Sequence, residues 1–597
     1  MGGNPLPPIK NILCTNLNLY LMKRIYFAIL LFVFTLPYSV AQWGSAIEQS
    51  LLLYSGNISD SEMAVAPNGA TWVYYQVSED ENFNGRVVCV QLLDTLGNKV
   101  FGEHGLLVSD YPNRSWNLCN DYLFVDRDGN AIITVHDTRN AVEKQFLSYT
   151  IYKISQDGEF LWGKDGLSLE GTQAFATSSH MTMTQIDDGS YVLAWGTVDE
   201  ATDQWSVKMQ RISPEGEMLW NLDEVTLSDP TGKTTYTWPT VIDAGLNQVI
   251  VVYFAGSSLD MMARKLDFDG TPVWSEDTKL YRGGWTSVPA WSLIDVKPSG
   301  DGGVIVAWND DRHLTGSRTY MTYVQTNGEI GFAAGIDGQK LGYSEYLGTQ
   351  ASCMYDPHTD TFLALWRESY SAVYYRIVAQ RLTKDGEPLW GEEGYELHPF
   401  STNQYAYGSI QTAPDGQAAF FYMHNNLKDL NTENFVTLLN TADTTQRKDF
   451  MFSPMDVFCE KFELASSALT PQNSWTVMWQ EGYSGSVVDI KMHRINTDLT
   501  LGSKNASVDA VEVEDFTFSA VADMVQGNTL FAVNATQATQ AVLTIYDLNG
   551  AVVATPFDGV LNVGKQYLEW NANVPAGVYL ATLTTHNGVK TVKILVK

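Results

Sequence analysis

The segment "DGEFLWGKDG", residues 157–166, decides the fold because the chain restates it. Related segments are "EGEMLWNLDE" from Glu215, "DGTPVWSEDT" from Asp269 and "DGEPLWGEEG" from Asp385. Each joins an Asp-Gly or Glu-Gly turn to a short apolar run that ends on Trp. A segment that returns about every 57 residues indicates a repeat architecture, in which each repeat forms one structural unit.

A second landmark alternates with the first. It is a turn followed by an apolar strand that ends on an aromatic residue, as in "PNGATWVYY" (67–75), "DDGSYVLAW" (187–195) and "GDGGVIVAW" (300–308), and eight copies occur. Short β-branched and aromatic runs between such turns are typical of strands, and each repeat has room for four. We therefore predict an all-β chain with an eight-bladed β-propeller over residues 42–502. Seven or nine blades are the alternatives, because divergent copies can be miscounted.

The two ends of the repeat region predict how the ring closes. The last repeat stops near "INTDLTLGS" at Ile495 without its Leu-Trp strand, and the segment "QWGSAIEQSLLLYSG" from Gln42 begins with a Trp-Gly pair that resembles the missing element. We expect the N-terminal segment to complete the last blade, which leaves no free sheet edge. The recurring Gly supplies the tight turn, and the recurring Trp is expected to pack between blades.

Composition excludes some functions. The formal net charge is −31 with no basic stripe, so we expect no nucleic acid partner. No closely spaced Cys or His motif indicates a metal or cofactor site, and none is predicted. Four cysteines follow the N-terminal leader, and we expect them to be small buried apolar residues rather than disulfides: Cys89, Cys119, Cys353 and Cys459.

The N-terminus resembles an export signal. Lys23 and Arg24 precede an apolar run from Ile25 to Leu36, and the small residues of Ser39-Val40-Ala41 form a cleavage site. The run is shorter than the roughly 20 residues a membrane-spanning helix needs. We predict an upstream extension over 1–21, a signal peptide over 22–41, and no transmembrane span in the mature chain.

The repeats end near residue 502. Residues 503–515 are small and acidic and predict a linker, and residues 516–597 alternate apolar and polar positions as in an immunoglobulin-like β-sandwich. Three segments appear there in order: "TIYDLNGAVV" (544–553), "VPAGVYLATL" (574–583) and the terminal "KTVKILVK".

These segments resemble the C-terminal sorting domain of the Bacteroidetes type IX secretion system. The positions that match the family pattern are Tyr546, Asp547, Gly550, Pro575, Gly577, Tyr579, Lys593 and Lys597. The family's Pro-Asn-Pro near the domain start is replaced here by "VADMVQGNTL". The resemblance implies passage across the outer membrane, with the secretion machinery as partner and an extracellular or outer-membrane-surface location.

Six of the aromatic residues at strand ends are candidates for binding. Equivalent positions of a ring lie on a circle, so these side chains are expected to form a stacking surface for a glycan or protein ligand. The alternative is packing between blades. The six are Tyr75, Trp195, Trp308, Trp366, Tyr422 and Trp479.

Acidic residues that follow the same strands support a second hypothesis. A glycosidase needs two carboxyl groups a few ångströms apart, whereas nearby Arg139, Arg312 and Arg367 predict ordinary ion pairs. The acidic residues are Asp137, Asp199, Glu200, Asp310, Asp311, Glu368 and Glu481. We predict a secreted or cell-surface binding or adhesion module that is not an enzyme and assign no catalytic residue; the alternative is a secreted glycan-acting hydrolase that uses these acids.

Overall fold

The structure is a computed structural model, and the described residues are strands and turns with no α-helix. The described residues are 43–78, 86–113, 122–137, 146–169, 174–175, 180–199, 204–221, 225–229, 231–283, 294–312, 316–342, 345–371, 374–401, 404–426, 431–453, 460–482, 487–503, 516–520, 524–525, 527–535, 538–547, 551–585 and 588–597. The predicted extension, signal peptide and all of the linker but Ser503 lie outside them. The chain divides into two compact units, Met1–Lys504 and Asn505–Lys597.

Strands β1–β33 of the first unit pair into eight antiparallel sheets. The first four contain β2 (Ile58–Val65), β3 (Thr71–Ser78), β4 (Arg86–Leu93) and β5 (Leu106–Asn113); β6 (Tyr122–Val125), β7 (Ala131–Asp137), β8 (Phe146–Ile154), β9 (Leu167–Ser168) and β10 (Ala174–Phe175); β11 (Met181–Gln185), β12 (Tyr191–Asp199), β13 (Gln204–Ile212) and β14 (Thr226–Leu227); and β15 (Tyr236–Gly245), β16 (Gln248–Ala255), β17 (Asp260–Leu266) and β18 (Thr278–Tyr281).

The other four sheets follow the same order. They contain β19 (Asp295–Pro298), β20 (Val304–Asp310), β21 (Arg318–Val324) and β22 (Gln339–Lys340); β23 (Leu347–Asp356), β24 (Thr361–Ser371), β25 (Tyr374–Leu382) and β26 (Tyr395–Ser401); β27 (Gln404–Thr412), β28 (Gln417–Asn426), β29 (Asn431–Asn440) and β30 (Arg447–Ser453); and β31 (Glu460–Ser466), β32 (Ser474–Gly482), β33 (Val488–Asn496) and β1 (Leu51–Gly56). Repeated four-stranded sheets that pack face to face are the β-propeller architecture, as predicted.

The second strand of each sheet explains the continuous apolar runs of the sequence. Every residue of β3 and of β20 is buried, because the sheets on both sides pack against these strands. The first strands contact one another from sheet to sheet, in the order β2, β6, β11, β15, β19, β23, β27 and β31. We call these eight the inner strands, because each contacts the first strand of a neighbouring sheet.

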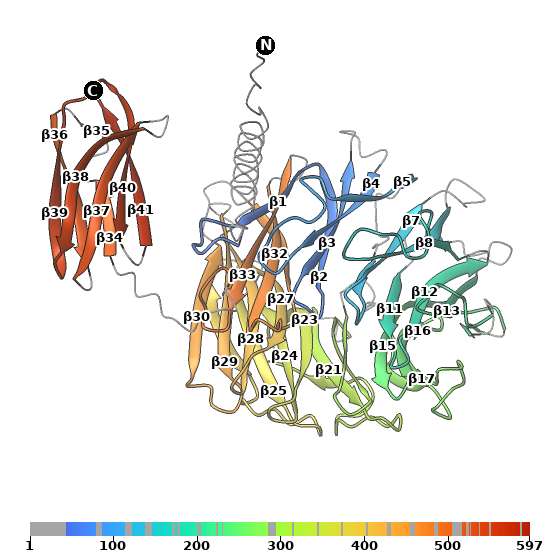
Figure 1. Cartoon of the computed structure of the whole chain (residues 1–597). Coiled ribbons are helices and arrows are strands. Elements are labelled where there is room, and N and C mark those ends of the chain that lie inside the picture. The colour runs from blue at the N-terminus through green and yellow to red at the C-terminus, as the bar shows by residue number, and fades with distance from the viewer. Residues whose placement is uncertain are drawn as a thin grey trace, which may run out of the picture. The chain divides into compact units, whose positions relative to one another are not determined.

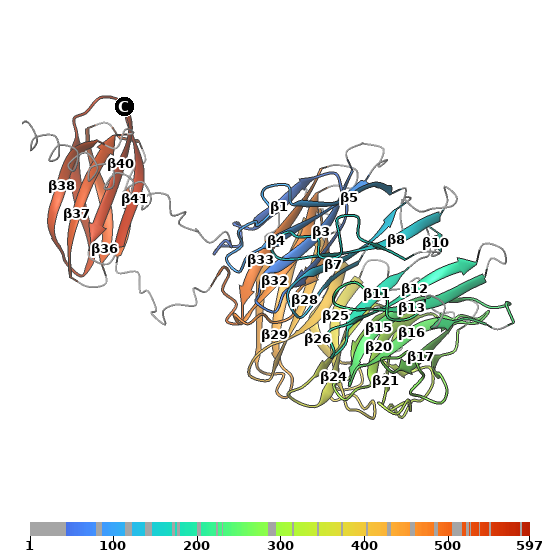
Figure 2. The ribbon, with the colours of Figure 1, turned by 45° about the vertical axis from the view of Figure 1, so that its right-hand side comes forward.

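The N-terminal segment completes the last sheet, which confirms the predicted strand exchange. β1 pairs antiparallel with β33, with Leu51 opposite Met492 and Ser55 opposite Asp489. Figures 1 and 2 both show β1, in blue, beside the orange β33 and β32. The same sheet also contacts the sheet of β2–β5, where the Thr71 and Thr476 hydroxyl oxygens lie 3.2 Å apart in the buried core.

The recurring Trp residues pack between neighbouring sheets, as predicted. The indole Nε1 of Trp162 donates to Pro214 O at 3.0 Å, and the indole Nε1 of Trp274 donates to Thr326 O at 2.9 Å, each in the turn of the following repeat. A Cβ on Gly216, where φ is +96°, would lie 2.8 Å from the Trp162 ring. Gly is therefore required there both for the backbone conformation and for the approach of the ring.

A basic residue near the end of the third strand adds a second link between sheets. Lys153 Nζ donates to Pro214 O at 3.2 Å, and Lys265 Nζ donates to Gly302 O at 2.9 Å. Arg494 links the sheet of β31–β33 to the turn that follows β4 in the same way, since its Nη1 donates to Thr95 O at 3.0 Å. These links were not predicted from the sequence, although a Lys stands five residues before the recurring turn Gly in "KISQDG" and "KLDFDG".

The second unit is a sandwich of two sheets around one apolar core. One sheet has the order β34 (Phe516–Ala520), β36 (Gly527–Ala535), β39 (Gly564–Ala572), and the other has the order β35 (Met524–Val525), β41 (Gly588–Val596), β40 (Gly577–Thr585), β37 (Thr539–Asp547), β38 (Val552–Leu561). Phe531 and Leu568 of the first sheet pack with Leu543 and Leu583 of the second.

Several predicted sorting residues stabilise turns of this sandwich. Asp547 accepts a hydrogen bond from the Ala551 amide at 2.9 Å, and the Tyr579 hydroxyl donates to Pro575 O at 2.9 Å. Tyr546 and Gly577 lie within β37 and β40, the side chains of Lys593 and Lys597 are exposed, and Gly550 lies outside the described residues. These positions support the strand-turn pattern, and their role in sorting stays a prediction.

Two of the four cysteines lie in the described part of the chain, and neither forms a disulfide there. Cys353 is buried, as predicted, whereas Cys89 is only partly buried; burial raises the pKa of the Cys89 thiol to about 11. Cys119 and Cys459 lie outside the described residues. Within those residues, we find no helix with the length and apolarity to cross a bilayer and no group of three metal-ligating side chains.

Candidate ligand pocket

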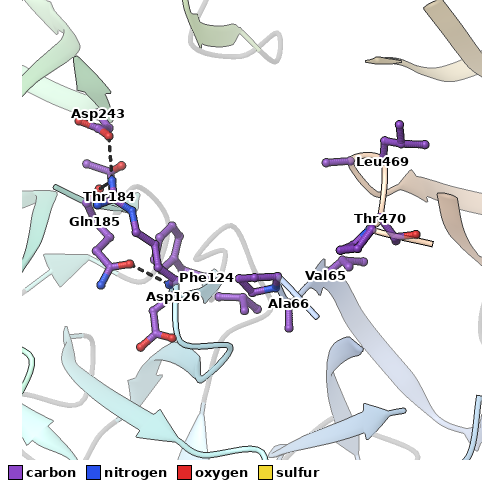
Figure 3. A pocket seen from close by; sticks show the side chains of 14 residues that line it. Val65, Ala66, Phe124, Asp126, Thr184, Gln185, Asp243, Leu469 and Thr470 are labelled. Carbon is purple, nitrogen blue, oxygen red and sulfur yellow. Dashed lines mark hydrogen bonds and ion pairs between the residues drawn. The ribbon is translucent and has the colours of Figure 1, made fainter. Parts of the chain in front are cut away.

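A cavity of about 550 Å³ lies where the ends of five inner strands converge. The turn between β2 and β3, the turn between β6 and β7, the ends of β11 and β15, and the turn between β31 and β32 contribute its lining (Figure 3). We call this cavity the axial pocket. Its lining residues are Val65, Ala66, Pro67, Phe124, Val125, Asp126, Arg127, Thr184, Gln185, Asp243, Ala468, Leu469, Thr470 and Pro471.

One wall of the axial pocket is polar and centred on Arg127. The Arg127 Nη1 donates to Ile186 O at 3.2 Å, and its Nη2 lies 3.3 Å from Asp243 Oδ2 and 3.6 Å from Asp187 Oδ1. The Arg127 amide donates to Gln185 Oε1 at 2.9 Å. These contacts fix the guanidinium, yet half of its side chain stays exposed, so it keeps donors for a ligand.

Asp243 is the carboxylate of that wall. Burial raises its pKa, and the neighbouring Asp187 adds to the rise, while Arg127 opposes it. The Asp126 carboxylate has buried partners of its own. Its Oδ2 accepts a hydrogen bond from the Tyr191 hydroxyl at 2.8 Å and lies 3.4 Å from Lys153 Nζ. The wall therefore offers one cation, Arg127, that is already paired with the carboxylates of Asp243 and Asp187, an arrangement that suits hydroxyl groups better than a strongly anionic ligand.

The opposite wall is apolar. Figure 3 shows Val65, Ala66 and Phe124 between the polar wall and the side chain of Leu469. A pocket with one apolar wall and a few fixed hydrogen-bonding groups is the usual form of a small-ligand site. It fits a ligand with one apolar face and one hydroxylated edge.

The six strand-end aromatics do not line this pocket. Their side chains have exposed fractions of 0–1% and pack between sheets: Tyr75, Trp195, Trp308, Trp366, Tyr422 and Trp479. The prediction that these six side chains form a stacking surface is therefore wrong. They pack in the core between sheets, which was the alternative interpretation of the sequence. The physical reason is that the strands that carry them are covered on both faces.

Three of the candidate acidic residues are buried in one repeated arrangement. The Trp308 Nε1 donates to Asp310 at 2.8 Å, and the Trp366 Nε1 donates to Glu368 at 2.9 Å. The Trp479 Nε1 donates to Glu481 at 3.3 Å. Each acid thus lies two residues after its Trp on the same strand and accepts from the indole.

A basic residue neutralises each of these acids. Arg312 pairs with Asp310, Arg376 Nη2 lies 2.6 Å from Glu368, and Lys491 Nζ lies 2.8 Å from Glu481. The predicted Arg312 pair is confirmed, whereas Arg376 rather than Arg367 binds Glu368. Carboxylates fixed in this way hold their own strands together and are not free for acid–base catalysis. Glu200 and Arg139 lie outside the described residues, as do the side chains of Asp137 and Asp199.

A different carboxyl pair, which the sequence patterns do not indicate, lies on two inner strands. Glu463 of β31 is at a β-bulge with φ of +55°, and Asp60 of β2 lies at a bulge of the adjacent inner strand. Burial raises the pKa of Glu463 to about 7, and the charge of Asp60 contributes to the rise. Gln480 donates both to Glu463 and to the Ser61 hydroxyl, so it bridges the two strands.

Comparison with known proteins identifies no family. No known family model and no curated protein sequence matches the chain. Among solved structures, the β-propeller domain of the Trilobed protease from Pyrococcus furiosus has 8% identity and a TM-score of 0.34, covering 68% of this chain and 98% of its own. An α-L-arabinanase of Penicillium chrysogenum, with arabinobiose bound, has 11% identity and a TM-score of 0.31, covering 66% of this chain and 98% of its own.

An endo-arabinase from Bacteroides thetaiotaomicron has 10% identity and a TM-score of 0.27, covering 45% of this chain and 94% of its own. Similarity this low transfers no function, and fold alone would not assign one.

Proposed function

We propose that this chain is an exported β-propeller that binds a glycan in its axial pocket. The observation that carries the proposal is the pocket itself, with Arg127 and Asp243 fixed on one wall and apolar side chains on the other. A sugar ring has an apolar face of C–H groups and an edge of hydroxyls, so it matches the two walls. The same proposal takes the eight sheets as eight blades of a closed ring and the second unit as an immunoglobulin-like domain.

The test is binding of a neutral glycan array by the purified chain, followed by the variant Arg127→Met. This substitution keeps the length of the side chain and removes its donors, and we expect at least a tenfold loss of affinity for any glycan that binds the pocket. The matched control is Arg282→Met. Arg282 is not a lining residue of the pocket, its side chain is 65% exposed, and its Nε lies 3.6 Å from Asp337 Oδ2. Equal affinity of the Arg127→Met variant and the unmodified chain would exclude the pocket as the glycan site.

The second candidate function is a glycan hydrolase, and the Glu463–Asp60 pair favours it. A carboxyl group with a pKa of about 7 can act as a general acid at neutral pH, and glycosidases pair such a group with a second carboxyl group. The pair lies on inner strands that lead to the axial pocket, about 15 Å along β31 from its turn.

Release of reducing ends from each bound glycan tests the hydrolase. If the chain is one, Glu463→Gln should abolish release and leave binding unchanged. The control Glu433→Gln removes the partner of His424, 3.1 Å away, and should not affect release. No release from any bound glycan would leave binding alone as the function.

Export by the type IX system and a surface location are also part of the proposal. The signal-peptide pattern and the three C-terminal motifs support it, and the separate second unit is consistent with a removable sorting domain. Deletion of residues 516–597 in a Bacteroidetes host should leave the propeller in the periplasm. Unchanged appearance of the truncated chain outside the cell would refute this route.

A further inference from the structure

Exposed aromatic side chains gather at one end of the sheet of β23–β26. Tyr370, near the end of β24, is 68% exposed, and Tyr374, at the start of β25, is 45% exposed. Tyr346, just before β23, and Phe400, near the end of β26, are half-buried, and the Tyr346 ring contacts the Tyr370 ring. We call these four residues the Tyr platform. It lies at the opposite end of the strands from the turns that line the axial pocket.

Three rings of the Tyr platform, those of Tyr346, Tyr370 and Phe400, form a connected group. The Tyr346 ring lies 5.8 Å from the Tyr370 ring and 5.0 Å from the Phe400 ring, with edge-to-face angles of 77° and 71°. The Arg376 guanidinium lies 5.2 Å from the Tyr346 ring and 4.9 Å from the Phe400 ring. Edge-to-face and cation–π contacts of this kind hold each ring in one orientation.

A buried ion pair anchors the group from below. Arg376 is 7% exposed and Glu368 is 2% exposed, and the Trp366 indole donates to the same carboxylate. On the outer side, Arg376 Nη1 lies 3.3 Å from Glu396, whose carboxylate side chain is 43% exposed. Because a ligand loses less free energy to side-chain ordering on a surface that is already rigid, this support pre-organises the exposed rings for binding.

We propose that the Tyr platform is a second carbohydrate site, which binds a neutral oligosaccharide by stacking a sugar ring on Tyr370 and hydrogen bonding its hydroxyls to Glu396. Exposed rings beside a fixed carboxylate match the alternation of apolar face and hydroxyl edge along a sugar chain. This inference does not rest on the pocket. The Tyr platform lies at the end of β24, about 35 Å along the 11 residues of that strand from its other end, which is the end of the sheets where the pocket turns lie.

The size of the exposed surface favours a sugar over a protein partner. At their exposed fractions, Tyr370 and Tyr374 present together roughly 200 Å² of surface. A stable protein interface needs about 800 Å² from each partner, which these two residues do not approach. One or two sugar rings cover a surface of this size.

The experiment is isothermal titration of the full chain with cellohexaose, xylohexaose and arabinohexaose. The variant Tyr370→Ala/Tyr374→Ala should weaken binding of at least one of these sugars tenfold or more, while Tyr111→Ala, which removes another exposed Tyr (42%), should not. Tyr370→Phe should bind like the unmodified chain, because the stacking ring is kept. Arg127→Met should leave this binding unchanged, which separates the Tyr platform from the axial pocket.

Three outcomes would overturn the proposal. They are no binding of any of the three sugars at millimolar concentration, equal binding by the double variant and the unmodified chain, and loss of binding in Tyr111→Ala as well. The exposed positions of Tyr370 and Tyr374 keep the test meaningful, since their removal takes no core packing away. Circular dichroism of each variant checks that its fold is intact.

Discussion

Replacement of Trp43 by Ala is expected to loosen the closure of the propeller at one place. Trp43 is 3% exposed and packs in a core shared by β1, β33 and the sheet of β2–β5. A Cβ on Gly97, in the first recurring turn, would lie 3.0 Å from its ring, and the Arg494 guanidinium lies 5.4 Å from it. Trp43 thus packs between the last sheet and the sheet of β2–β5, as Trp162 packs between the sheets of β6–β10 and β11–β14.

The size of the effect follows from the burial of the ring. Truncation of a buried Trp to Ala destabilises the packed structure by about 3–5 kcal/mol. Within the described residues the Trp43 Nε1 has no hydrogen-bond partner, so packing supplies nearly all of this energy. If β1 opens locally, the change corresponds to amide exchange that is faster by a factor of roughly one hundred to several thousand.

Hydrogen exchange read by mass spectrometry is the assay. Peptides covering β1 and β33 should lose protection in Trp43→Ala, while peptides of β15–β18 keep theirs. The control is Leu52→Ala, because Leu52 belongs to the same strand but is 45% exposed. Unchanged protection of β1 and β33 in Trp43→Ala, or an equal loss throughout the propeller, would refute the proposed role of this residue.

Three further predictions concern stability. Burial lowers the pKa of His493 to about 4, so the folded chain resists protonation of this side chain. The free energy of unfolding should therefore be unaffected by His493 above pH 6.5 and should fall by up to about 3 kcal/mol as the pH drops to 4. His493→Gln should remove this loss from the urea-denaturation profile. The pKa of Glu463 is raised to about 7, so the charge of this carboxylate destabilises the folded chain above that pH. Glu463→Gln should therefore stabilise the chain by up to about 3 kcal/mol at pH 8 and have no effect at pH 4. Equal effects at both pH values would contradict the raised pKa. Gly216→Ala should lower the melting temperature more than Gly163→Ala, because both residues have positive φ but only Gly216 has a Trp ring within 4 Å; equal shifts would show that the ring gives way.

The repeats made the architecture predictable from the sequence. The recurring Gly and Trp carry local turn chemistry and a packing role that each copy repeats, so the strands, the buried Trp162 and the N-terminal strand exchange followed from spacing alone. That the N-terminal segment completes the last repeat was also predictable without tertiary information, because the repeat that ends near Ile495 lacks its Leu-Trp strand and Trp43 begins a segment that resembles it.

The site was not predictable in the same way. Trp195 and its equivalents end strands that are covered on both faces, and the sequence does not show which of two faces a neighbouring sheet covers. Glu463 and Asp60 are brought together by bulges on two strands about 400 residues apart in the chain, and bulges leave no sequence signal of their own. Arg127 belongs to a turn that resembles every other turn of the repeat, and only the convergence of the ends of five inner strands makes it a pocket residue.

The closure of the ring by the N-terminal strand is tested most directly by a disulfide across β1 and β33. Ser55 and Asp489 are register partners, so the variant Ser55→Cys/Asp489→Cys should form an intramolecular disulfide under mild oxidation, seen as one cross-linked peptide pair by mass spectrometry. Leu52→Cys/Asp489→Cys should not, because the register partner of Leu52 is Lys491 rather than Asp489. A cross-link absent from the first variant, or equally abundant in both, would contradict a propeller closed by its own N-terminal strand.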